Sequence, residues 1–110
     1  MNLNYMKSKV ESYLGFARKS GKLAAGYNAC IAAMEKRTLK LLLISPGLSE
    51  NSRKKFQKRA DSQKVPICWN DETEALSEAV GLRGIAVLGV LDPNLASAIL
   101  NQLNHDGQNA

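Results

Sequence analysis

Apolar residues recur at helical spacing in several stretches of the chain, and short apolar runs lie between them. The first of these stretches predicts a helix over residues 4–20, which Gly21 can end in the left-handed conformation. The residues expected on its buried face are Met6, Val10, Leu14 and Ala17.

Two further helices are predicted from their first residues. Gly26 is predicted to open a helix over residues 26–36. Ser49 can accept a hydrogen bond from a first-turn N–H group and so cap a helix over 50–62. Phe56 and Ala60 are expected on the buried face of that helix.

The last two helices also have signals at their ends. Asp71 and Glu74 have the spacing of a capping box and predict a short helix that Gly81 ends. Asp92, followed by a proline, is a favourable start for the final helix. The polar residues 105–110 are predicted to form a frayed tail.

Four apolar segments are predicted to be strands. Residues 39–44 and 85–91 are almost continuously apolar, as expected of strands that are covered on both faces. Residues 23–24 and 65–69 are shorter candidates. Because helices and strands alternate, we expect an α/β fold in one domain over residues 1–104, with helices on both faces of a central sheet.

The charge balance indicates a class of partner. The 110 residues include 15 Lys and Arg against 10 Asp and Glu, a formal net charge of +5. A basic protein favours anionic partners, nucleic acid before an acidic membrane surface. No signal peptide is visible and the longest apolar run, 41–44, is too short to span a bilayer. We therefore expect a cytoplasmic protein with no membrane partner.

Residues suited to catalysis or metal binding are scarce. The single histidine, His105, falls in the predicted tail, and Asp71 and Glu74 serve a helix start. Cys30 and Cys68 have apolar neighbours, which predicts two buried thiols in a reducing compartment; a disulfide or redox pair is the alternative. We expect no enzyme, metal, cofactor or small-molecule substrate.

The start of the helix over 26–36 is the first candidate site. A helix N-terminus offers unpaired N–H groups and partial positive charge, which suit phosphate, and a glycine allows close approach. The amide of Asn28 can donate and accept together, as reading a base edge requires; an ordinary surface role is the alternative. The candidate residues here are Lys19, Lys22, Gly26, Tyr27 and Asn28.

The second candidate site is the loop before the last strand. It carries two apolar side chains, Val80 and Leu82, next to Arg83. Apolar side chains in an exposed loop can contact an unstacked base. The alternative is that both of them fold under the loop into the core.

The helix over 50–62 also presents a basic face. A run of charges on one helix is usually a solvated face, and phosphate contact is the second possibility. Its basic residues are Arg53, Lys54, Lys55, Lys58 and Arg59.

Several motifs in order resemble the kink-turn RNA-binding ribosomal-protein superfamily, the L-seven-Ae and L-thirty-e group, and in particular its small bacterial YlxQ-like members. Gly26-Tyr27-Asn28 falls where that family carries Gly-x-Asn, and Ala79-Val80-Gly81 falls at its glycine-bearing loop. The other matching segments are 14–23, 33–36, 40–44 and 49–52.

The resemblance implies a three-layer α/β/α sandwich with a mixed sheet of about four strands. It also implies binding to a kink-turn, a sharply bent RNA motif with tandem sheared G·A pairs. Asn28 would contact a sheared-pair guanine, and Gly26 would allow the close approach. The remaining assignments are phosphate contact for Lys19, Lys22 and Arg37, and cover of the extruded nucleotide for Val80, Leu82 and Arg83.

The chain departs from the family pattern at two positions. Ala29 and Ala32 stand where many members carry Glu and Lys. This removes one polar base reader and one cation, so a stem-loop or ribosomal RNA junction is an alternative target. The functional alternatives are a protein-interaction module with this fold and an accessory subunit of an RNA-modifying enzyme. We expect a monomer that binds structured RNA, with ribosomal RNA as one candidate.

Overall fold

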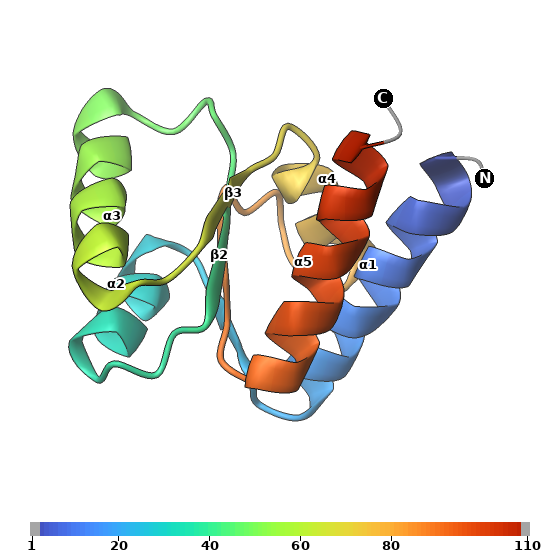
Figure 1. Ribbon diagram of the computed structural model, residues 1–110, viewed down its shortest axis with the longest axis horizontal. Helices are drawn as coiled ribbons and strands as arrows, with labels where there is room; N and C mark the ends of the chain where they lie inside the picture. Colours follow the sequence, from blue (N-terminus) through green and yellow to red (C-terminus); the bar gives the residue numbers. More distant parts are fainter. Residues whose placement is uncertain (1–2, 109–110) are drawn as a thin grey trace.

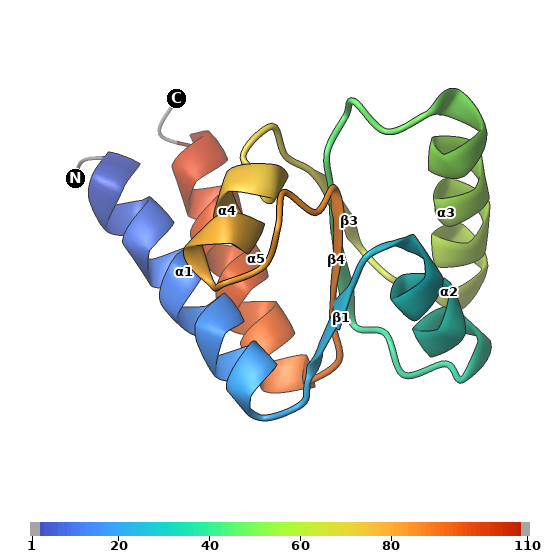
Figure 2. The same cartoon turned by 180° about the vertical axis from the view of Figure 1, so that it is seen from behind.

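A four-stranded sheet forms the middle layer of the molecule (Figures 1 and 2). The computed structural model of the chain describes residues 3–108, with side chains from 9 to 104. The strands lie in the order β1-β4-β2-β3; β4 is antiparallel to both of its neighbours, and β2 and β3 are parallel. The predicted mixed sheet is confirmed. The strands are β1 (Leu23–Ala25), β2 (Leu41–Ile44), β3 (Ile67–Trp69) and β4 (Val87–Val90).

Helices cover both faces of this sheet. In Figure 1, α2 and α3 lie on one side of it and α1, α4 and α5 on the other, which confirms the three-layer sandwich. The helices of the described residues are α1 (Leu3–Lys19), α2 (Tyr27–Glu35), α3 (Glu50–Gln63), α4 (Thr73–Ala79) and α5 (Pro93–Gln108).

The core is divided by the sheet into two clusters. Successive side chains of a strand point to opposite faces. Leu42 and Ile44 therefore pack with α2 and α3, whereas Leu41 and Leu43 pack with α1, α4 and α5. All four are fully buried, which is why residues of this strand are apolar without interruption. On α3, the two residues predicted to face the core, Phe56 and Ala60, are likewise buried.

Three of the predicted helix ends are confirmed. Ser49 Oγ accepts a hydrogen bond from Ser52 N (3.3 Å), so it caps α3. Asp92 Oδ2 accepts one from Leu95 N (2.8 Å) and caps α5. Gly21 follows α1 with φ 72°.

The predicted capping box at the start of α4 is wrong. The helix begins at Thr73, after both Asp71 and Glu72. Asn70 orders this turn instead: its Oδ1 accepts from Glu72 N (2.7 Å) and its carbonyl oxygen accepts from Thr73 Oγ1 (2.7 Å). An Asn side chain at a turn can bond its own backbone two residues on, and here that bond moves the helix start.

The predicted tail over 105–110 is also wrong in part. Helix α5 continues to Gln108, since polar residues remove burial but do not break a helix. Residues 109–110 and the side chain of His105 lie outside the described part of the chain.

The two cysteines pack on opposite faces of the sheet, so they do not form a pair. Cys30 is buried in the α2–α3 cluster, and Cys68 is half-buried against the other cluster. Burial raises the pKa of the Cys30 thiol to about 12 and also raises the pKa of Cys68. The expectation of buried thiols therefore holds fully for Cys30 and partly for Cys68.

Candidate functional site

The start of α2 lies beside the start of β4 (Figure 2). Gly26 N donates a hydrogen bond to Val87 O (2.9 Å), which extends the β1–β4 pairing to the end of β1. Gly26 adopts φ 94°, a conformation that residues with a side chain rarely adopt, so the glycine sets the angle at which α2 leaves the sheet. Asn28 follows as an exposed residue in the first turn.

The first turn of α2 has no side-chain cap, in contrast to α3 and α5. The N–H groups of Tyr27, Asn28 and Ala29 consequently have no acceptor within the helix. The positive end of the helix dipole adds to them. This end of α2 can therefore receive an acceptor such as a phosphate or base oxygen.

Tyr27 has a structural role as well as a place in the candidate site. Its half-buried ring meets the ring of Phe56 edge to face, with the centroids 5.3 Å apart. Lys55 Nζ lies 5.5 Å from the centroid of the Tyr27 ring. The residue before Asn28 is thus fixed between α3 and the sheet, and this limits the movement of Asn28.

The loop between α4 and β4 packs on the opposite face of the sheet from α2. Val80 and Leu82 are half-buried and pack with the cluster of α1, α4 and α5, while Arg83 is exposed. The expectation of two exposed apolar side chains is therefore only half right, because both partly fold into the core. The loop still reaches the α2 start through its last residues, which lead directly into Val87.

Sequence reasoning missed two residues that hold this loop. The guanidinium of Arg18, on α1, donates a hydrogen bond to Val80 O. Ser77 is buried and its Oγ accepts from Ile85 N (2.8 Å). The Arg18 contact joins positions 62 residues apart, so no local pattern could have indicated it.

Lys19 and Lys22 lie away from the start of α2. Lys22 O accepts from Leu91 N (2.9 Å) at one end of the β1–β4 pair, whereas Gly26 lies at the other end. Strand β1 separates Lys22 from Gly26 by about 13 Å. Both lysines are exposed, but the structure does not bring them together with Asn28.

Arg37 lies beyond the opposite end of α2. It is exposed, has φ 57°, and borders a groove between α2 and α3. The length of α2 separates it from Asn28 by about 13 Å. Of the nine predicted site residues, the three consecutive ones, Gly26, Tyr27 and Asn28, are held together at the start of α2. The flanking cations lie away from them, and the apolar residues of the α4–β4 loop pack on the opposite face of the sheet, so the nine do not form one continuous patch.

Two kinds of feature are absent from the described residues. Among them, no three His, Cys, Asp or Glu side chains gather where they could hold a metal ion. None of the helices within 3–108 is long and apolar enough to cross a bilayer.

The sequence model of the ribosomal protein L7Ae/L30e/S12e/Gadd45 family matches residues 8–100, which includes the start of α2 and the loop before β4. The chain belongs to this family.

Relatives in the L7Ae/L30e/S12e/Gadd45 family include two curated bacterial proteins. The RNA-binding protein YlxQ of Bacillus subtilis (strain 168) is 25% identical over 91 residues, covering 83% of this chain and 91% of that protein. The RNA-binding protein YlxQ of Enterococcus faecium is 28% identical over 91 residues, covering 82% of this chain and 86% of that protein.

The fold has a solved counterpart. A protein of unknown function from Bacillus halodurans C superposes with a TM-score of 0.79 at 22% identity, covering 87% of this chain and 97% of that one. This similarity supports the architecture of the sandwich independently of the family match.

Two alanines on α2 stand at the positions where the resemblance implies Glu and Lys. Ala29 and Ala32 are both exposed on α2, one and four residues after Asn28. Residues four apart on a helix share a face, so Ala32 shares the face of Asn28 and adds no charge to it. Asn28 is thus the one exposed polar side chain of the first turn of α2.

Proposed function

We propose that this chain is a non-enzymatic RNA-binding protein that recognises a kink-turn or a similar bent internal loop. The observation that carries the proposal is the hydrogen bond between Gly26 N and Val87 O, because it places the uncapped start of α2 beside the end of the α4–β4 loop. The family match and the RNA-binding names of the two relatives support it.

Each part of the site has a distinct task in this proposal. The free N–H groups of the first turn donate hydrogen bonds to a phosphate or base oxygen, and the Asn28 amide pairs with the edge of a sheared guanine. Leu82 and Arg83 flank the extruded nucleotide, the first by apolar contact and the second by charge. Ribosomal RNA is the target class that we infer.

The proposal includes a cytoplasmic location and a monomeric state. The net charge of +5 suits an RNA partner in the cytoplasm. The described side chains expose two large apolar groups, Phe16 and Trp69, on different elements. Because these two do not make a broad apolar patch, we infer a monomer.

Replacing Asn28 by Ala tests the assignment directly. We expect the affinity for a kink-turn RNA to fall by about 1–3 kcal/mol, the usual worth of a bidentate base contact. The matched control is Asn94→Ala, because Asn94 is also the exposed second residue of a helix, on α5. Electrophoretic mobility titrations would compare the two; equal affinity of both variants would remove Asn28 from the site.

A further inference from the structure

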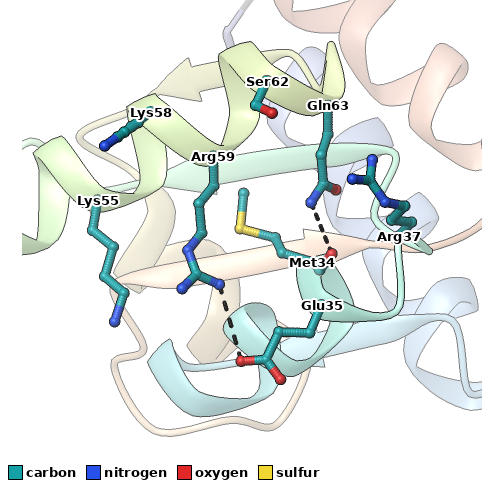
Figure 3. A pocket seen from close by; sticks show the side chains of 8 residues that line it. All are labelled: Met34, Glu35, Arg37, Lys55, Lys58, Arg59, Ser62 and Gln63. Carbon is teal, nitrogen blue, oxygen red and sulfur yellow. Dashed lines mark hydrogen bonds and ion pairs between the residues drawn. The ribbon is translucent and has the colours of Figure 1, made fainter.

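A basic groove runs between α2 and α3 (Figure 3). Four cations line it, three from α3 and one from the turn after α2, and Met34 forms part of its floor. The cations are Lys55, Lys58, Arg59 and Arg37. One carboxylate, that of Glu35, faces them; its Oε1 is 4.0 Å from Arg59 Nη1. The groove therefore keeps a strong positive excess.

The walls of the groove are fixed by packing at both ends. At one end, the Tyr27 and Phe56 rings meet edge to face. At the other end, Gln63 Nε2 donates a hydrogen bond to Met34 O (2.9 Å), a dashed line in Figure 3. The two helices cannot separate without losing both contacts, so the cations are held on a preformed surface.

A solvated helix face does not account for this arrangement. Lys54, on the same helix, pairs with Glu50 (3.2 Å) and lies outside the groove. In Figure 3, Arg59 extends from α3 toward α2, and Arg37 enters from the far end. Cations that two elements contribute to one groove raise the local potential and favour an extended anion.

One residue that lines the groove, Lys55, reaches the start of α2. Lys55 Nζ lies over the Tyr27 ring, and Tyr27 directly precedes Asn28. From Lys55 to Gln63 the groove follows α3 for about 12 Å. A polyanion that is bound at Asn28 can therefore continue along α3 and remain close to basic side chains.

We propose that this groove holds the sugar–phosphate backbone of the RNA strand that leaves the site at Asn28. This inference rests on the proposed function. It assigns Lys55, Lys58 and Arg59 to phosphate contact. Arg37 is assigned the same role at the far end of the groove. Such contacts fix the orientation of the RNA and do not read its sequence.

The test compares two triple variants that remove the same charge. The groove variant is Lys55→Gln, Lys58→Gln, Arg59→Gln; the control is Lys40→Gln, Lys54→Gln, Lys64→Gln, three exposed lysines that do not line the groove. The probe is one kink-turn RNA with a single-stranded extension, titrated at several salt concentrations. Thermal unfolding verifies that both variants fold.

We expect the log–log salt slope to become shallower by about 2 in the groove variant and by less than about 0.5 in the control. At low salt this corresponds to an affinity loss of roughly 10- to 100-fold for the groove variant. Equal slopes in the two variants would overturn the proposal and leave an acidic protein segment as the better occupant.

The same titrations separate this inference from the proposed function. The ratio of affinities for a kink-turn RNA and for an RNA without sheared pairs should stay constant in the groove variant, because phosphate contacts do not discriminate. A wild type that fails to discriminate would contradict kink-turn recognition. A slope difference between the variants would still support backbone binding in the groove.

Discussion

Replacing Phe56 by Ala is expected to lower the free energy of unfolding by about 3–5 kcal/mol. Phe56 is fully buried in the cluster beneath α2 and α3. Its loss removes apolar burial, leaves a cavity, and deprives Tyr27 of its edge-to-face partner. Because a domain of this size has only about 5–15 kcal/mol of stability, urea unfolding should show a much lower midpoint.

The chain offers a matched control for this change. Phe16 is 70% exposed on α1, so Phe16→Ala should alter the free energy of unfolding by no more than about 0.5 kcal/mol. A similar loss in both variants would contradict the placement of Phe56 in the core. Residual folded Phe56→Ala protein should also bind RNA more weakly, since Tyr27 positions Asn28.

Replacing Gly81 by Ala is expected to cost about 2–3 kcal/mol of unfolding free energy. Gly81 has φ 89°, where a side chain costs roughly 1–2 kcal/mol. A Cβ there would also overlap the guanidinium of Arg18, which must then release Val80 O, a loss of about 1 kcal/mol. Chemical denaturation of the variant measures the sum of the two costs.

Gly21→Ala separates these two costs. Gly21 also has a positive φ, 72°, but a Cβ at that position would meet nothing within 4 Å. It should therefore show the backbone cost alone and be less destabilising than Gly81→Ala by about 1 kcal/mol. If the two variants are equally destabilised, the Arg18 contact contributes nothing to holding the loop.

The sequence predicts the elements of this fold well because each is locally specified. The run over 41–44 must be buried on both faces, and Ser49 and Asp92 can act as caps from their own helix starts. The boundaries are less predictable. Apolar residues at 39, 85 and 91 flank the strands without belonging to them, because burial extends beyond the ladder of hydrogen bonds. Asn70 displaced the start of α4 through a bond that competes with the capping box.

The candidate site was predictable only where it is contiguous in the chain. Gly26, Tyr27 and Asn28 are consecutive, and the structure keeps them together at the start of α2. Lys22 is close to them in sequence, but β1 carries it to the opposite end of the pair. The Arg18–Val80 contact and the groove depend on packing between distant segments. Periodicity and spacing contain no information on such contacts.

Kink-turn recognition is tested by a titration of the unmodified protein against two RNAs of equal length and charge. One carries a kink-turn, and in the other the tandem sheared G·A pairs are replaced by Watson–Crick pairs. We predict that the first binds at least about fivefold more tightly, since one lost base contact costs about 1–3 kcal/mol. Equal dissociation constants for the two RNAs, at both low and physiological salt, would contradict the central claim that the start of α2 reads a bent RNA motif.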